Sequence, residues 1–488
     1  MTGSDLITKT RIIKLSVSQI FTAPNLAGLL SMVLLFAYTF LISLAKGGRW
    51  DLYQPLAMSD VGIEYWEPGI QGLASSTPYF PGVAFFLSSL AAVGLPSEES
   101  ALALAAIVTA LVPLSLGYIG RRLGVTMEVG YQTVIYSGFA AIFLNPWIWY
   151  SGEFKPDSFA LLFFVVGYLL LTSKNPLLVW IAIVPITSSL LMKQQIVAPV
   201  LALFLGYLAL SLIRRDLSSL RISISIFLSL ALAALAILWT PGALFYTVLA
   251  HTGRGFLWTL DAGYLRPLLG LGVLLAGGLW LLASKRAGTL RGHLSSVLTP
   301  FGFAASAWFA AGSLGALNAG GNAGNLAAGA LLFLPLLGVL AKPSSAKKVA
   351  AGASFLALLA LNLNAFTSGS LVAYQDRVEN NSLVRSLVQQ ASPKRILINS
   401  DSYLVVRGLK VEILDLDTWG HIRLGAFAQT LPTTATGILK QVEPDMILCI
   451  NGCKEFLSTL DAGFLSSEFE SRDTFGTGAQ LYILRTAD

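Results

Sequence analysis

The run LAGLLSMVLLFAYTFLISLA, residues 26–45, contains no charged side chain. A helix needs about 20 apolar residues to cross about 30 Å of hydrocarbon, and in lipid its backbone polar groups must be satisfied within the segment. The run therefore predicts a transmembrane helix. No small-residue cleavage site follows it, so we expect an uncleaved signal anchor rather than a removed signal peptide.

The rest of the chain repeats this pattern. Of its 488 residues, 55% are hydrophobic and only 12% are charged, which lies outside the range of ordinary soluble domains. We predict an α-helical polytopic membrane protein with about eleven transmembrane helices. Their expected ranges are 26–45, 100–119, 129–148, 157–172, 177–192, 195–213, 222–239, 267–284, 296–314, 324–341 and 348–366.

Basic residues indicate the orientation, because Lys and Arg near helix ends are retained on the cytoplasmic side. One set of alternate loops holds fifteen of them, and the other set, before residue 367, holds six. We therefore expect an N-in, C-out protein. The net charge of +6 follows from this topology, so the expected partner is the lipid bilayer and no nucleic acid.

The predicted domains are a cytoplasmic segment, 1–25, a transmembrane region, 26–366, and an extracytoplasmic α/β domain, 367–488. The last contains four β-rich runs, which are RILINS, VEILDL, DMILCI and QLYILR. Its two cysteines, Cys449 and Cys453, lack the partner set of a metal site, and on the outer side a disulfide between them is chemically permitted.

The first outer loop, 46–99, is long and carries carboxylates. In MSDVGIEYWEPGIQGLASSTPYFPG, residues 58–82, Asp60, Glu64 and Glu67 stand at i, i+4 and i+7, so a short helix here would put all three on one face. Pro68 disfavours helix at Glu67 and leaves Asp60 and Glu64 as the firmer pair. A carboxylate at an interface can act as a general base, and a solvated loop is the alternative.

An apolar stretch from Pro81 to Pro96 is shorter than a span, and we expect it to form a helix at the outer interface. A later outer loop, WYSGEFKPDSF, adds Glu153, Lys155 and Asp157. Mixed charges at a helix start are also typical of a cap and an interface anchor, so both readings stay open for these three residues.

Outer cations form a candidate phosphate site. In LLMKQQIVAP, Lys193 and Gln194 interrupt two apolar runs, and a lysine on the outer side requires a compensating group. Arg254 and Arg266 flank His251 in the loop that follows. Lys and Arg bind phosphate, so these residues could hold a lipid-linked phosphate, whereas simple snorkelling to the interface is the alternative.

The stretch LGALNAGGNAGNLAAG, residues 314–329, lets backbone N–H groups approach a ligand, and its candidates are Gly321, Asn322 and Asn325. The three histidines have no metal-ligand spacing, and no nucleotide-binding fingerprint is present. We therefore predict no cofactor and leave a divalent metal open.

Together these features resemble the polytopic GT-C glycosyltransferases, the class that includes protein O-mannosyltransferases and the aminoarabinose transferases that act on lipid A. The stretches FKPDSFALLF, MKQQ and GGNAGN occupy similar places in the order of helices. Two departures from the family pattern are Val61, where many relatives have Glu, and Gly82, where many have a second proline. The matching residues of the first outer loop are Asp60, Tyr65, Gly72, Pro78, Tyr79 and Pro81.

The resemblance implies transfer of a sugar from a polyprenyl phosphate to an acceptor hydroxyl of a lipid, glycan or protein on the outer face, with inversion. It assigns Asp60 as the general base, and because an outer α/β tail is frequent in bacterial members of the family, we expect a bacterial plasma (inner) membrane. We further expect Glu64 to help at the acceptor site and keep Asp51 as a further candidate in the loop. The rival class is a transporter or lipid flippase, which usually has ionisable residues inside its spans. An assembly subunit with an outer recognition domain is a third class.

Overall fold

The computed structural model describes most of the helical region and parts of the C-terminal tail. The described residues are 22–47, 49–65, 79–94, 97–144, 154, 156–249, 299–317, 324–340, 345–399, 402–415, 443–450, 453, 462–474 and 479–484.

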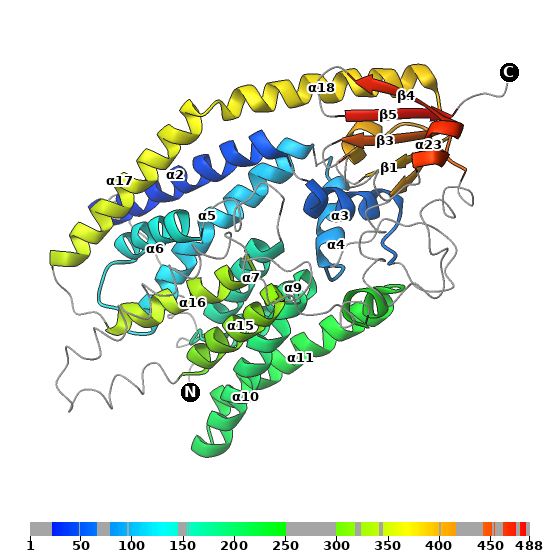
Figure 1. Ribbon diagram of the computed structural model, residues 1–488. Helices are drawn as coiled ribbons and strands as arrows, with labels where there is room; N and C mark the ends of the chain where they lie inside the picture. Colours follow the sequence, from blue (N-terminus) through cyan, green and yellow to red (C-terminus); the bar gives the residue numbers. More distant parts are fainter. Residues whose placement is uncertain are drawn as a thin grey trace, which may run out of the picture.

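Helices dominate the described chain up to residue 391, and they pack side by side in Figure 1. They are α2 (Ala23–Lys46), α3 (Arg49–Val61), α4 (Gly82–Ala91), α5 (Glu98–Arg122), α6 (Val129–Phe143), α7 (Pro156–Leu171), α8 (Pro176–Ile181), α9 (Ile183–Met192), η1 (Gln194–Ile196), α10 (Val197–Arg214), α11 (Leu217–Trp239), η2 (Phe245–Leu249), α15 (Pro300–Leu317), α16 (Gly324–Leu340), α17 (Ser345–Thr367) and α18 (Ser370–Ala391).

Within the described residues, five helical stretches are long and apolar enough to cross a membrane. They are Ala23–Lys46, Glu98–Arg122, Gln194–Arg214, Leu217–Trp239 and Lys348–Thr367. This bears out the expectation of an α-helical membrane protein. The predicted total of about eleven spans stays a prediction, and the expected span 267–284 lies outside the described residues.

The outer surfaces of α10 and α11 are apolar. Leu212, Phe227, Leu235 and Trp239 all leave more than half of their surface uncovered by protein. Large exposed apolar surfaces of this kind mark contact with lipid or another apolar partner. These helices are therefore suited to face the hydrocarbon of a bilayer.

One expected span, 177–192, is divided in the structure. α8 ends at Ile181 and α9 begins at Ile183, with Ala182 between them. Pro185 explains the division, because it has no backbone N–H to donate to the Ile181 carbonyl. Polar contacts then tie the broken segment to its neighbours, since Ser189 donates to the Ala160 carbonyl of α7.

Contacts at the helix ends join loops that the charge count places on the same side. At the expected inner end, Arg122 of α5 donates to the Leu169 carbonyl and to Thr172. At the expected outer end, the Tyr65 N–H donates to the Pro241 carbonyl at 2.9 Å. The predicted alternation of helix directions itself stays a prediction.

After α18 the described chain forms a five-stranded sheet in the order β2-β1-β3-β5-β4. The elements are β1 (Arg395–Ile398), α19 (Tyr403–Val406), β2 (Glu412–Asp415), β3 (Met446–Ile450), α23 (Ala462–Glu468), β4 (Phe469–Thr474) and β5 (Ala479–Leu484). β1 runs parallel to both β2 and β3, whereas β5 runs antiparallel to β3 and β4. Figure 1 shows the sheet at one end of the helical region, beside α3.

The four predicted β-rich runs coincide with β1, β2, β3 and β5, so these strand predictions are confirmed. β3 is buried along its whole length, as expected for a central strand with both faces covered. A disulfide joins Cys449 at the end of β3 to Cys453. The extracytoplasmic location of this part of the chain remains a prediction.

Candidate functional site

Asp60 lies in the last turn of α3. The N–H of Gly62 closes this turn on the Met58 carbonyl at 2.9 Å, and Gly62 then adopts a φ of 147°, which is almost restricted to glycine. Asp60 and Glu64 therefore do not share one helix face, because α3 ends at Val61. Glu64 is exposed beyond the helix, and Glu67 lies outside the described residues.

Two side chains of the tail hold the Asp60 carboxylate. Arg407 donates from Nε to Oδ2 at 2.7 Å and from a terminal nitrogen to Oδ1 at 3.1 Å, and the Tyr403 hydroxyl donates to Oδ2 at 2.7 Å. The side chains of Asp60 and Arg407 are each 26% exposed. Asp60 is thus not a solvated loop residue but the contact between the first outer loop and the sheet.

The local structure after β1 presents Tyr403 and Arg407 to this carboxylate. The buried Asn399 side chain both donates to the Ile450 carbonyl and accepts from the Ile450 N–H, which fixes the end of β1 against β3. α19 follows at once, and Arg385 of α18 donates to the Val405 carbonyl at 3.0 Å. The Ser402 N–H, directly before α19, donates to the Asn399 carbonyl at 2.9 Å, so contacts before and within this helix hold the segment that carries Tyr403 and Arg407.

Tyr65 and Tyr79 organise the next part of the outer loop. Tyr65 is fully buried, and its hydroxyl donates to the Tyr79 carbonyl at 2.7 Å. Tyr65 packs in a small apolar cluster with Met58, Phe80 and Ile237. Both tyrosines therefore support the end of α3 and its junction with the end of α11.

Lys193 and Asp157, which the sequence offered as separate candidates, form one buried ion pair at 2.5 Å. Asp157 supplies the compensating charge that the outer lysine requires, and the Lys193 ammonium also lies 6.0 Å from the centre of the Tyr79 ring. The next residue, Gln194, donates to the Thr247 carbonyl at 3.3 Å. This arrangement joins α7, α9 and the segment after α11 near the first outer loop.

The side chains of the remaining candidates are not among those that the structure describes. Only the backbone of Asp51, in α3, and of Asn325, in α16, is described. Among the described residues no group of three or more His, Cys, Asp and Glu side chains could hold a metal ion. The candidates that lie outside the described residues are Glu153, Lys155, His251, Arg254, Arg266, Gly321 and Asn322.

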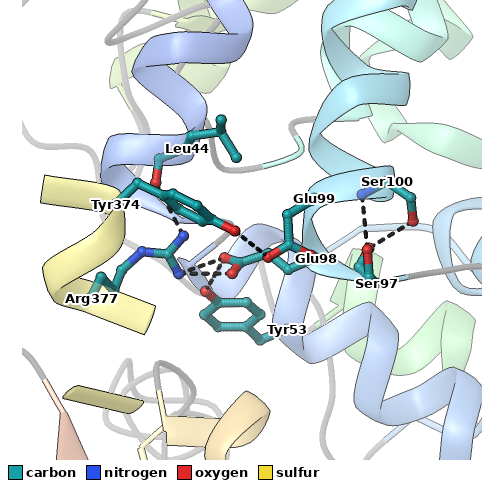
Figure 2. Close-up of polar contacts among 8 residues, drawn as sticks. All are labelled: Leu44, Tyr53, Ser97, Glu98, Glu99, Ser100, Tyr374 and Arg377. Carbon is teal, nitrogen blue, oxygen red and sulfur yellow. Dashed lines mark hydrogen bonds and ion pairs between the residues drawn. The ribbon is translucent and has the colours of Figure 1, made fainter. Parts of the chain in front are cut away.

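A second charged cluster, absent from the sequence-based candidates, anchors α18 to the two ends of the first outer loop (Figure 2). Arg377 of α18 donates to both oxygens of Glu98, at 2.9 and 2.8 Å, and to the Leu44 carbonyl at 3.1 Å. The Tyr53 hydroxyl donates to Glu98 at 2.7 Å. The Tyr374 hydroxyl donates to Glu99 at 2.9 Å.

The electrostatics of this cluster favour its charged pair. Burial disfavours the charged form of Arg377, but the combined effect of Glu98, Tyr53 and Glu99 outweighs burial and raises the pKa of Arg377 above its ordinary value. Burial, together with the hydrogen bond to Glu99, raises the pKa of Tyr374, which therefore stays a hydrogen-bond donor. Arg377 and Tyr374 thus hold the start of α18 against α5 at neutral pH.

Only a weak signal for the tail residues is present in the sequence. Tyr403 and Arg407 flank a short apolar run directly after the first strand of the tail, and ligands of α/β sheets bind at the carboxyl ends of parallel strands. Arg377 and Glu98 are separated by 279 residues, so no local pattern could pair them.

Comparison of the chain with models of known protein families gives no match, and comparison with curated proteins gives no significant match.

Proposed function

We propose that this protein is an inverting membrane glycosyltransferase of the GT-C kind, which moves a sugar from a polyprenyl phosphate to an acceptor hydroxyl on the extracytoplasmic face. The observation that carries the proposal is the setting of Asp60. The carboxylate that the resemblance assigns as base is partly exposed, with an arginine and a tyrosyl hydroxyl bound to it. The Tyr403 hydroxyl at 2.7 Å supports the proposal, because it is a hydroxyl at hydrogen-bond distance from this carboxylate, as an acceptor hydroxyl must be for general-base catalysis.

In the proposed reaction Asp60 takes the proton of the acceptor hydroxyl while the acceptor oxygen attacks the anomeric carbon. The bond between that carbon and the donor phosphate breaks, and its electron pair stays on the phosphate oxygen. Because phosphate is a weak base, this leaving group requires cations rather than a proton donor. Arg407 is the cation that lies on Asp60, and Arg254, Arg266 and His251 keep their proposed role in holding the phosphate.

The buried pair has a supporting role in this proposal. Lys193 is neutralised by Asp157, so the full charge of the lysine is not available to a ligand while the pair is intact. The pair instead fixes the end of α9 beside Tyr79, which lies in the same loop as Asp60. We therefore assign Lys193 and Asp157 to the walls of the donor site.

Two observations support an extracytoplasmic site in a bacterial envelope. The Cys449–Cys453 disulfide is of a kind that persists in oxidising compartments. Asp60, Glu98 and the tail residues that bind them all belong to segments that the distribution of Lys and Arg assigns to the outer side. A role in glycan biosynthesis of the cell envelope follows from the proposed donor and location.

A transporter or flippase of envelope glycan precursors is the second candidate, and the buried Lys193–Asp157 pair favours it, because paired ionisable groups between membrane helices are typical of transport pathways. Purified protein in vesicles separates the two candidates. We expect transfer of radiolabelled sugar from a polyprenyl-phosphate donor to an acceptor extract. Movement of the donor across the vesicle membrane without any sugar transfer would contradict the enzyme proposal and favour the transporter.

The product can be identified in cells. Mass spectrometry of lipid-linked glycans and envelope polysaccharides in a deletion strain should show loss of one sugar and accumulation of its polyprenyl-phosphate donor. An unchanged glycan profile together with unchanged donor levels would contradict the proposed role in the envelope.

A further inference from the structure

The Arg407–Asp60 contact is an ion pair that a ligand can open. Arg407 presents Nε and one terminal nitrogen to the two oxygens of the carboxylate, at 2.7 and 3.1 Å. The same planar fork of donors fits two oxygens of a phosphate equally well. A phosphate group could therefore take the place of the carboxylate without any change in the shape of the arginine.

The exposure of the two tail arginines separates their roles. At the Arg377–Glu98 pair the two side chains are only 17% and 8% exposed, and Arg377 also holds the Leu44 carbonyl, so this pair is a fixed anchor. At the Arg407–Asp60 pair both side chains are 26% exposed. Water and a ligand can reach the second pair, and the anchor keeps the tail in place when that pair opens.

Asp60 cannot serve as a base while Tyr403 and Arg407 both bind its carboxylate. From the described residues, Oδ2 accepts hydrogen bonds from Tyr403 and Arg407, and Oδ1 accepts one from Arg407. A general base must direct a lone pair at the hydroxyl that it deprotonates. Departure of Arg407 frees one position on each oxygen and leaves a carboxylate without its neutralising cation.

The position in the sheet is suited to ligand binding. Arg407 and Tyr403 follow β1, which has β2 on one side and β3 on the other, both parallel to it. The carboxyl end of a strand at which the strand order reverses is the general ligand site of open α/β sheets. Tyr403 and Arg407, in the segment that follows this strand, bind the Asp60 carboxylate.

We propose that Arg407 binds the donor phosphate and is paired with Asp60 when no donor is bound. The phosphate of the lipid-linked sugar then displaces the carboxylate from Arg407 and so frees the base. This inference rests on the proposed function. It couples the two substrates, because Asp60 becomes able to accept a proton only after a donor phosphate is bound. The sugar–phosphate bond breaks with its electron pair on phosphate, which gains negative charge, so Arg407 binds the leaving group more strongly than the donor.

Binding of the product, polyprenyl phosphate, tests the inference without turnover. The full-length protein is placed in nanodiscs of uncharged phosphatidylcholine, and the Kd is measured for wild type and variants. We expect Arg407→Gln to weaken binding about tenfold and Arg407→Lys to weaken it less, because lysine keeps the charge but loses the fork. Asp60→Asn should tighten binding several-fold, because it removes the competing carboxylate.

The two variants break the same ion pair, so a merely structural pair would make both weaken binding. Arg395→Gln is the matched control, since Arg395 pairs with Glu412 on the same sheet at 2.8 Å and in a more exposed position. It should bind as wild type. Native-like binding by Arg407→Gln, or weakening by Asp60→Asn, would overturn the inference.

A second arm identifies the source of the phosphate. Phosphatidylglycerol added to the nanodiscs should not displace polyprenyl phosphate at equal amounts, and equal competition would overturn the assignment to the donor. The outcome is distinct from that of the proposed function. If the variants bind as expected but the protein transfers no sugar, the phosphate site is supported and the proposed enzyme activity is not. If the protein transfers sugar but Arg407→Gln binds polyprenyl phosphate as wild type does, the enzyme activity is supported and this phosphate site is not.

Discussion

Replacement of Arg377 by glutamine tests how the tail is attached to the membrane helices. The change removes the guanidinium that donates two hydrogen bonds to Glu98, at 2.9 and 2.8 Å, and leaves this buried carboxylate with the Tyr53 hydroxyl. Removing one partner of a fully buried ion pair costs about 3–5 kcal/mol. Because Arg377 is 17% exposed and Glu98 keeps a donor, we expect a smaller loss of about 2–3 kcal/mol.

Hydrogen exchange of α18 measures this loss directly. The helix opens locally when its anchor is lost, and 2–3 kcal/mol corresponds to exchange that is about 30- to 150-fold faster. The double variant Arg377→Gln and Glu98→Gln should recover much of the loss, because no unpaired charge is left in the protein. The exposed Arg395–Glu412 pair is the control, and its disruption should change the free energy of opening of α18 by less than about 1 kcal/mol.

Exchange of α18 at the wild-type rate in Arg377→Gln would refute this reasoning. Strict addition of the two single effects in the double variant would also refute it, because residues that share one ion pair must show a coupling energy.

Three further predictions concern single positions. Gly47→Ala should loosen α18 as well, because Gly47 has a φ of 78° and an added Cβ would lie 2.8 Å from an Arg377 nitrogen; exchange of α18 reports it. Gly82→Ala should lower the melting temperature, because its Cβ would lie 2.6 Å from the Leu191 carbonyl oxygen of α9. Hydrogen bonds from Ser219 and Ser218 lower the pKa of Asp216. Its carboxylate should therefore still cap α11 below about pH 4 and lose this role only in stronger acid. Hydrogen exchange of residues 217–220, measured as a function of pH, tests this.

Composition was sufficient to predict the membrane-spanning character of the chain, because lipid demands long runs without charge. The strands of the tail were equally accessible, since short β-branched runs between polar segments stand out in β1 and β3. The outer lysine illustrates a partial success. Its charge required a partner, but only the packing of α7 against α9 shows that Asp157 is that partner.

Two features were beyond the sequence for physical reasons. The spacing of Asp60 and Glu64 suggested one helix face, yet the backbone conformation of Gly62 ends α3 between them. The partners of Asp60 lie more than 340 residues away, in and directly after α19. Pairings of this length are set by tertiary packing, and no local pattern encodes them.

The most direct test of the account is sugar transfer by the Asp60→Asn variant from a polyprenyl-phosphate donor, with Glu412→Gln as a control that removes an exposed carboxylate of the sheet. Asparagine keeps the shape of the side chain but cannot accept the proton. We predict a fall in kcat of about 10²- to 10⁴-fold in a folded variant, with the control unchanged. Transfer by folded Asp60→Asn at the wild-type rate would contradict the assignment of Asp60 as the base.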